Sequence, residues 1–229
     1  MFDGYVGHIL GGAVLTLKTA FGSMLIATVL GLLGALARLS PRWIFNKPAS
    51  LYSTVVRGIP DLVLMLLVFY GGQQLANDLL ARLGYQGQFD FDQFTAGVLT
   101  LGFIYGAYLV ETFRGAILGV PKGQWEAGYA YGMSASRTFL RIVLPQMIRL
   151  AIPSYTNNWL VLTKATALVS VIGLQDMMLR AKEAGGATRE PFTYLLVVGA
   201  VYLAITSVSL GLLKLAERRY SVGVRHGEL

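Results

Sequence analysis

Long runs of residues without a charged side chain constrain this chain more than any other feature. Five such runs of mainly apolar composition occur, and only Lys164 interrupts one of them; they cover 19–37, 62–77, 93–110, 150–175 and 191–213. A helix needs roughly 20 mostly apolar residues to cross the hydrocarbon layer of a bilayer. The runs therefore predict an all-α membrane protein with five transmembrane helices, at about 12–37, 54–77, 93–114, 150–175 and 191–214.

The composition points to the same class of protein. Charged residues make up 14% of the chain and hydrophobic residues 55%, whereas a soluble domain has about 25% charged residues. The 229 residues suffice for about five spans with short connections, so we expect one domain, 1–229. Cysteine is absent and only His8 and His226 could offer imidazole ligands, which argues against disulfides and metal sites. The basic residues are spread through loops without interleaved aromatics, so nucleic acid is not an expected partner.

The distribution of positive charge predicts the orientation of the helices. The connection between the second and third predicted spans holds one basic residue, Arg82, whereas three other segments are rich in Lys and Arg. Those three segments are the connection between the first and second spans, the connection between the third and fourth, and the C-terminal tail. Because basic loops stay in the cytoplasm, we expect the N-terminus outside the cytoplasm and the C-terminus inside it. Residues 1–7 carry no basic group, so we expect the first apolar run to be a retained helix and not a cleaved signal.

The segment 121–145 is polar enough to lie outside the membrane, on the predicted cytoplasmic side. Pro121 and Gly123 precede a stretch, 125–131, that predicts about two helical turns, and Gly132 allows a sharp turn with positive φ. Ser134 or Ser136 can cap a second helix to about 143, and Pro145 predicts its junction with the next element. A short amphipathic helix, turn and helix suits a groove in a partner protein. An ordinary basic loop at the membrane surface is the alternative.

Motif spacing separates these two interpretations. The arrangement Glu126-Ala127-Gly128, then Gly132, then nine residues and Ile142-Val143-Leu144-Pro145 resembles the coupling loop of ABC-importer permeases, which docks into an ATPase subunit. Gly128 stands where that family usually has a second alanine. Further segments resemble the permeases for polar and basic amino acids, of the histidine/lysine/arginine/ornithine and arginine/ornithine types; they lie at 57–61, 102–108, 111–115, 157–159, 164–170 and 217–221.

The resemblance implies a type I ABC importer permease fold and a specific set of partners. These are two ATPase subunits that hold ATP and magnesium, a second and often non-identical permease subunit, and a periplasmic amino-acid-binding protein, all at a bacterial inner membrane. The chain has no Gly-x-x-x-x-Gly-Lys-Ser/Thr loop and no hydrolase constellation, so we expect it to be non-catalytic and to bind no cofactor. The residues implied in ATPase coupling are Glu126, Ala127, Gly128, Gly132, Ile142, Leu144 and Pro145.

Polar residues within the predicted spans are candidates for the substrate pathway, because such residues usually face the interior of a helix bundle. The candidates are Asp61, Glu111, Asn157, Asn158 and Thr166. Each has a structural alternative: Glu111 can pair with Arg114 and Asp61 with Arg57 along one helix, and the asparagines can bond a neighbouring helix. Related permeases for cationic amino acids often have an acid where this chain has Asn158. Gly102 and Gly106 are spaced for close helix packing.

Two other functions remain open from the residues alone. An ion-gradient-driven secondary amino-acid transporter is one, although such proteins have internal repeats and more spans. A non-transporting membrane scaffold that binds a soluble partner through 121–145 is the other. The resemblance favours an importer permease for polar, basic amino acids such as arginine, ornithine, histidine and lysine.

Overall fold

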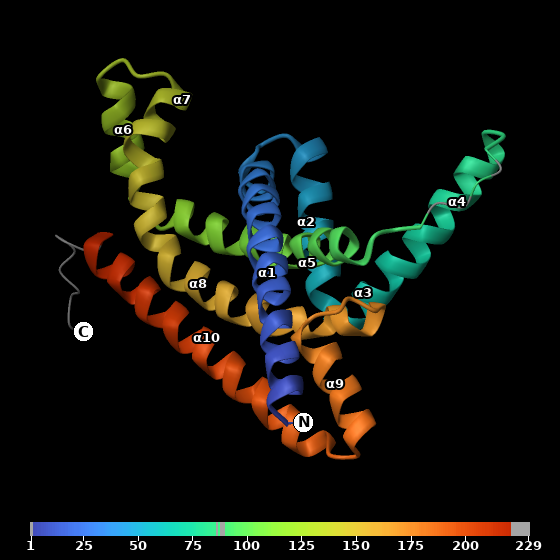
Figure 1. The fold of residues 1–229 in the computed structure, drawn as a ribbon. Coiled ribbons are helices and arrows are strands. Elements are labelled where there is room, and N and C mark those ends of the chain that lie inside the picture. Colours follow the sequence, from blue (N-terminus) through green and yellow to red (C-terminus); the bar gives the residue numbers. More distant parts are fainter. Residues whose placement is uncertain (1, 86, 88–89, 221–229) are drawn as a thin grey trace.

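The computed structural model describes residues 2–85, 87 and 90–220, and every regular element in these ranges is a helix (Figure 1). The expectation of an all-α protein is confirmed. The helices are α1 (Phe2–Leu39), α2 (Trp43–Gly58), α3 (Asp61–Leu66), the π-helical η1 (Leu67–Gly71), α4 (Gly72–Arg82), α5 (Gln93–Leu118), α6 (Lys122–Ala130), α7 (Ala135–Thr138), the π-helical η2 (Phe139–Val143), α8 (Leu144–Ala165), the 3₁₀ helix η3 (Thr166–Ile172), α9 (Met177–Thr188) and α10 (Pro191–Tyr220).

Four helical units in the described part of the chain are long and apolar enough to cross a membrane; they are Gly4–Leu39, Asp61–Arg82, Gln93–Leu118 and Pro191–Leu215. A fifth unit consists of Ala135–Ile172 and Met177–Thr188, which meet at an angle of 54°. Counting this bent pair as one crossing gives five. The left-handed backbone of Gly173, with φ 90°, lies at the bend, where an L side chain would be strained.

Helix α1 begins at Phe2 and α8 at Leu144, both earlier than the predicted spans. Two further differences arise where the helical backbone changes. Residues 54–58, which we assigned to the second span, instead end α2, and the chain then breaks at Ile59 and Pro60 before α3 begins at Asp61. Proline has no N–H to continue a helix and restricts the residue before it to extended backbone. Residues 166–175, assigned to the fourth span, form the 3₁₀ helix η3 and the loop that leads to α9.

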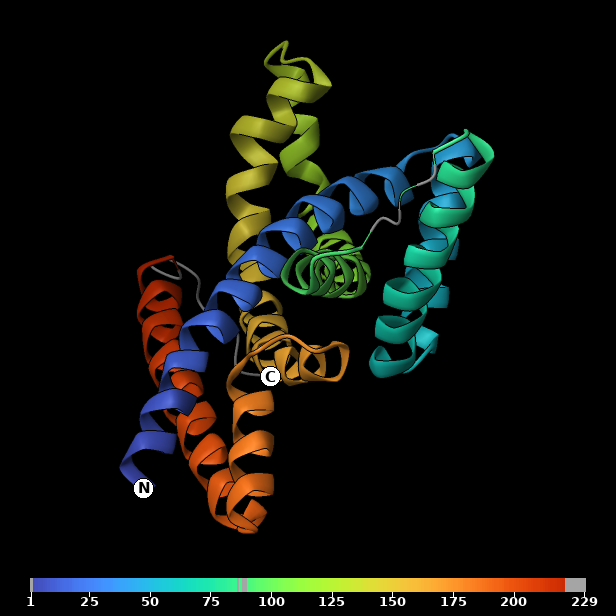
Figure 2. The ribbon, with the colours of Figure 1, turned by 45° about the vertical axis from the view of Figure 1, so that its right-hand side comes forward.

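The packed centre of the molecule is the crossing of α1 and α5, which Figure 2 shows with α5 viewed nearly end-on. Glycines allow the close approach: a Cβ at Gly102 would lie 2.7 Å from the Ile26 side chain, and one at Gly106 would lie 2.7 Å from the Tyr52 hydroxyl. The packing role expected for Gly102 and Gly106 is confirmed. Leu101, Ile104 and Leu109 of α5 are fully buried in the same core.

The start of α5 is fixed by a side-chain cap. Asp92 Oδ2 accepts a hydrogen bond of 2.8 Å from the Thr95 backbone amide and another of 2.8 Å from the Thr95 hydroxyl. Such bonds satisfy the free N–H groups of a first helical turn. They also hold the pKa of the exposed Asp92 carboxyl below its usual value, because they stabilise its charged form.

In contrast to α5, helix α4 projects away from the body of the molecule (Figure 1). It has no buried residue, and its leucines at 75 and 79 are exposed, as are Leu83 and Tyr85 just beyond its end. The segment α3–η1–α4 is therefore held to the rest of the described structure mainly through its first half, where Leu64, Met65 and Phe69 are buried.

Candidate functional site

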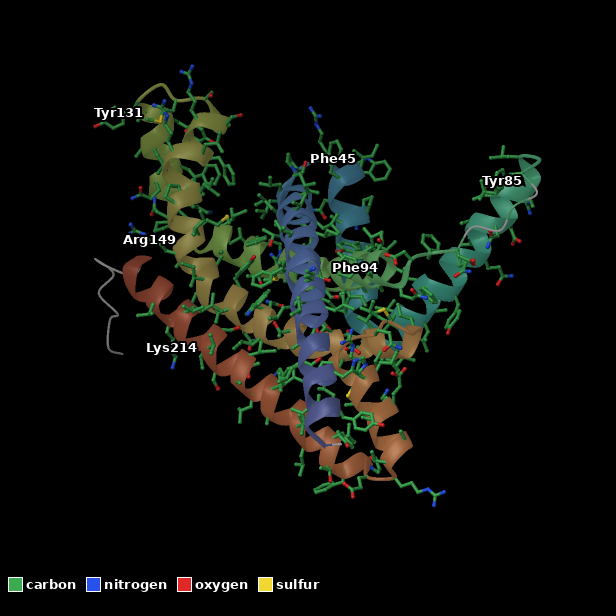
Figure 3. The ribbon with its side chains drawn as sticks, viewed as in Figure 1. Phe45, Tyr85, Phe94, Tyr131, Arg149 and Lys214 are labelled. Carbon is green, nitrogen blue, oxygen red and sulfur yellow. The ribbon has the colours of Figure 1, made fainter. Side chains whose placement is uncertain are left out.

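The segment 121–145, called the coupling loop below, stands clear of the helical body in Figure 1 and carries Tyr131 at its tip in Figure 3. Helix α6 ends in a tight turn in which the Gly132 amide donates to the Tyr129 carbonyl at 2.9 Å and the Met133 amide to the Gly128 carbonyl at 3.0 Å. Gly132 has φ 74°, a left-handed conformation that closes helix ends and suits glycine. The positive φ expected at Gly132 is confirmed.

The seven residues implied in coupling occupy different environments. Glu126, Ala127, Gly132 and Pro145 are exposed, Ile142 and Leu144 are partly covered, and Gly128 is buried. Leu144 packs against the hydrophobic core. The exposed surface of the loop also includes the large side chains of Tyr129, Tyr131 and Leu140, and Tyr131 is 86% exposed.

The expected junction at Pro145 is confirmed in position, since η2 ends at Val143 and α8 begins at Leu144, but no break in the helical backbone marks it. Helices α7, η2 and α8 follow one another without an intervening loop, and Pro145 lies in the first turn of α8. The change in helical hydrogen bonding that a proline requires coincides with the π-helical turn η2 just before it. The coupling loop is therefore continuous with α8.

The two arms of the coupling loop hold each other through contacts that the sequence analysis missed. The rings of Trp125 and Phe139 lie 6.2 Å apart between centroids, tilted by 31°. Gln146 of α8, one residue beyond the loop, donates from Nε2 to Gln124 Oε1 at 3.2 Å. An isolated tryptophan in a polar loop was the available signal, because a large aromatic side chain there needs a packing partner.

A charged cluster joins α1, α2 and α5 around Glu111. Arg38 forms an ion pair with one carboxylate oxygen of Glu111, and Arg114 Nε lies 3.0 Å from the other. The Ser53 hydroxyl of α2 accepts from Arg38 at 3.1 Å and donates to Glu111 at 3.3 Å. The expected Glu111–Arg114 pair is confirmed. The contribution of Arg38 was missed because it lies far from Glu111 in sequence.

The alternative pairing of Arg57 with Asp61 is wrong, since no ion pair joins them in the described structure. The guanidinium of Arg57 lies over the Tyr108 ring, 5.5 Å from its centroid, and Asp61 accepts a hydrogen bond of 3.2 Å from the Tyr105 hydroxyl. The helix break at Ile59 and Pro60 separates the two residues. Their spacing of four therefore does not place them on one helix face.

A polar cavity of about 470 Å³ lies beside the charged cluster, between α2, α5 and α8. It brings together three of the five pathway candidates, Glu111, Asn157 and Asn158, whereas Asp61 and Thr166 lie outside its lining. Its remaining lining residues are Arg57, Tyr108, Thr112, Pro153 and Ser154.

The two asparagines differ in their bonding. Asn158 Nδ2 donates to Thr112 Oγ1 at 3.2 Å and to the Ser154 carbonyl at 2.8 Å, so the interhelical bond considered above is present for Asn158. Asn157 is exposed. The Thr166 hydroxyl is buried and donates to the Thr163 carbonyl at 2.6 Å, which is a local helix bond.

Sequence comparison assigns the chain to a family. Residues 27–222 match the model of the "Binding-protein-dependent transport system inner membrane component". The chain belongs to this family. It is 50% identical to the histidine/lysine/arginine/ornithine transport system permease protein HisQ of Salmonella typhimurium, with all of both chains covered. It is also 40% identical to the octopine transport system permease protein OccQ of Rhizobium radiobacter, over 98% of this chain and 95% of that one.

Solved structures agree with this assignment. A crystal structure of an amino acid ABC transporter with histidines contains a chain that matches with a TM-score of 0.81 and 32% identity, over 95% of this chain and 96% of the other. The inward-facing MetNI methionine ABC transporter has the same fold, with a TM-score of 0.74 at 17% identity, over 96% and 99% of the chains. The fold is that of a type I ABC importer permease.

Proposed function

We propose that this chain is a translocation subunit of an ATP-driven, binding-protein-dependent importer for polar, basic amino acids of the arginine, ornithine, histidine and lysine class. The observation that carries the proposal is the identity of 50% with a histidine/lysine/arginine/ornithine permease over the full length of both chains. The similarity to an arginine permease, ArtQ of Haemophilus influenzae, at 39% identity over 98% of this chain and 100% of that one, supports the same substrate class.

The proposed assembly contains two ATPase subunits, a second permease subunit that is a non-identical relative, and a periplasmic amino-acid-binding protein. ATP and magnesium would bind to the ATPase subunits, and this chain would carry out no catalysis. The basic loops support an inner-membrane orientation with a periplasmic N-terminus and a cytoplasmic C-terminus. In this orientation the coupling loop faces the ATPase subunits.

The connectivity supports a route for coupling. The coupling loop connects α5 to α8, and these two helices supply most of the lining of the polar cavity. Movement of the coupling loop by an ATPase would therefore act directly on α8, with which the loop is continuous, and on α5 through the short turn at 119–121. Transport of this kind needs two discrete arrangements of the bundle whose populations depend on nucleotide.

We place the substrate pathway at this cavity. The exposed amide of Asn157 can both donate to a carboxylate and accept from an ammonium group, and Asn158 and Glu111 lie beside it. Glu111 is already shared by two arginines, which leaves it little free negative charge for a cationic substrate. The negative charge for the substrate side chain would then come from the second permease subunit.

The test is purification from membranes in mild detergent, followed by uptake in proteoliposomes loaded with ATP. We expect an ATPase subunit to co-purify in stoichiometric amount and radiolabelled arginine to enter only with ATP inside and binding protein outside. Glu126→Lys should abolish uptake while the chain remains in the membrane, and Lys122→Glu, on the same helix, is the control for a charge reversal.

Two results would redirect the assignment. Uptake that collapses with an ionophore but is indifferent to ATP would indicate a secondary transporter. Binding of a soluble partner without flux of amino acid would indicate a scaffold.

A further inference from the structure

Positive charge exceeds negative charge around the polar cavity. Only two charged side chains line it, Arg57 of α2 and Glu111 of α5. Arg38 and Arg114 each pair with one carboxylate oxygen of Glu111. Three guanidinium groups therefore lie at or beside the cavity against one carboxylate, and arginine keeps its charge in proteins. The electrostatic potential of the cavity favours an anionic group of a ligand.

Arg57 differs from the other two arginines because it has no carboxylate partner. The ion pairs of the described structure join Glu111 to Arg38 and to Arg114, and none includes Arg57. The nearest acid along the chain, Asp61, lies outside the lining of the cavity and accepts a hydrogen bond from the Tyr105 hydroxyl. The guanidinium of Arg57 is therefore the positive group at the cavity that a carboxylate of a ligand can still pair with.

The ring of Tyr108 orients this guanidinium. Arg57 lies in the last turn of α2, and its guanidinium carbon is 5.5 Å from the centroid of the Tyr108 ring on α5, within the range of about 6 Å for a cation–π contact. A guanidinium offers two parallel N–H groups that fit the two oxygens of a carboxylate. Because the ring already restricts the long side chain, less freedom is lost when a ligand binds.

We infer that Arg57 binds the α-carboxylate of the amino acid that passes through the cavity, and that Tyr108 is the positioning residue for its guanidinium. The α-carboxylate is common to arginine, ornithine, histidine and lysine, so this chain recognises the part of the substrate that these amino acids share. The exposed amide of Asn157, on α8, accepts from the α-ammonium group. The inference rests on the proposed function, because it takes the cavity to be the substrate pathway.

The test is equilibrium binding to the complete importer in phospholipid nanodiscs, without the binding protein. The two probes are arginine and agmatine, which is arginine without its carboxylate. The wild-type complex should bind arginine at least tenfold more tightly than agmatine. Arg57→Gln should weaken the binding of arginine at least tenfold and should not weaken that of agmatine. The same variant should weaken the binding of lysine and of histidine by the same factor as that of arginine.

Three further variants sharpen the test. Arg57→Lys keeps the charge without the two parallel N–H groups, and it should lower the preference for arginine over agmatine at least threefold at unchanged affinity for agmatine. Tyr108→Leu removes the ring beneath the guanidinium and should lower the same preference at least threefold. Arg42→Gln, at the other end of α2 and outside the lining of the cavity, is the control and should bind both probes as the wild type does.

Several results would overturn the inference. These are a wild-type complex that does not prefer arginine to agmatine, an equal loss of both probes in Arg57→Gln, and a loss confined to one of the three amino acids. If Arg57→Gln does not assemble, Arg57→Lys decides, and an unchanged preference in that variant overturns the inference. ATP-driven uptake of arginine by the wild type separates the two failures: with uptake present only the role of Arg57 fails, and without it the proposed function fails as well.

Discussion

The crossing of α1 and α5 and the coupling loop are stabilised in opposite ways. At the crossing, the two long helices pack through fully buried side chains, and glycines lie where an added Cβ would meet a neighbouring side chain. In the coupling loop most residues are exposed, and only Gly128, Thr138 and Val143 are buried. The comparison teaches that the crossing can be stable within this chain alone, whereas the exposed surface of the coupling loop is suited to be completed by a partner. Substitutions should therefore affect abundance in the first region and coupling in the second.

The largest effect is expected from overpacking the crossing. In Gly102→Leu the Cβ atom of the new side chain would lie 2.7 Å from the side chain of Ile26. Overpacking a core costs typically 1–3 kcal/mol and more where the backbone cannot move. We expect the amount of the chain in the membrane fraction, measured by immunoblotting, to fall at least tenfold. Gly199→Leu, in α10 with no atom within 4 Å of a Cβ, should accumulate normally, and equal loss of both variants would contradict the account.

In the coupling loop, a substitution should lower uptake and leave the amount of the chain in the membrane unchanged. Gly132→Val forces a β-branched residue into φ 74°, a conformation that costs of order 1–3 kcal/mol for such residues. We expect uptake of arginine to fall below a tenth of the wild-type rate while the amount of chain in the membrane stays within twofold. Gly123→Val on the same loop lies in open space and should retain uptake. A Gly132→Val chain with normal uptake would show that the turn geometry is unimportant.

The smallest of the three effects is expected at the charged cluster, which contributes only a small part of the stability of the crossing. Arg38→Ala removes one of two arginines from Glu111 and also the bond to Ser53. The cluster is partly exposed, so we expect a loss of roughly 1 kcal/mol, seen as a fall of a few degrees in the unfolding midpoint of the purified complex. Lys47→Ala on α2, exposed and in no ion pair within the described structure, should leave the midpoint unchanged. An equal shift of the midpoint in Arg38→Ala and Lys47→Ala would show that the charged cluster contributes no more to stability than an exposed lysine.

Local rules account for what the sequence could predict. Runs without charge predicted an all-helical membrane protein, the spacing of three residues predicted the Glu111–Arg114 pair, and a glycine after a helix predicted the left-handed turn at Gly132. Each of these depends on residues close together in the chain. The motif spacing added the family, which the comparisons show.

Features that depend on distant residues could not be predicted in this way. Arg38 reaches Glu111 only because α1 and α5 cross, and the polar cavity exists only where α2, α5 and α8 meet. The wrong pairing of Arg57 with Asp61 came from applying a helical spacing across the break at Ile59 and Pro60. The junction predicted near Pro145 contains no break in the helical backbone, because the π-helical turn η2 leads directly into α8.

The most direct test of the central claim, that the coupling loop is the contact to the ATPase, is site-specific cross-linking. The chain has no cysteine, so Tyr131→Cys at the tip of the coupling loop and Tyr85→Cys beyond α4 each introduce one thiol. Both tyrosines are exposed, 86% and 59%, and they lie far apart in Figure 3. With a thiol-to-amine cross-linker in native membranes, we expect Tyr131→Cys to yield a product with the ATPase subunit and Tyr85→Cys to yield none. A product from Tyr85→Cys and none from Tyr131→Cys would contradict the account.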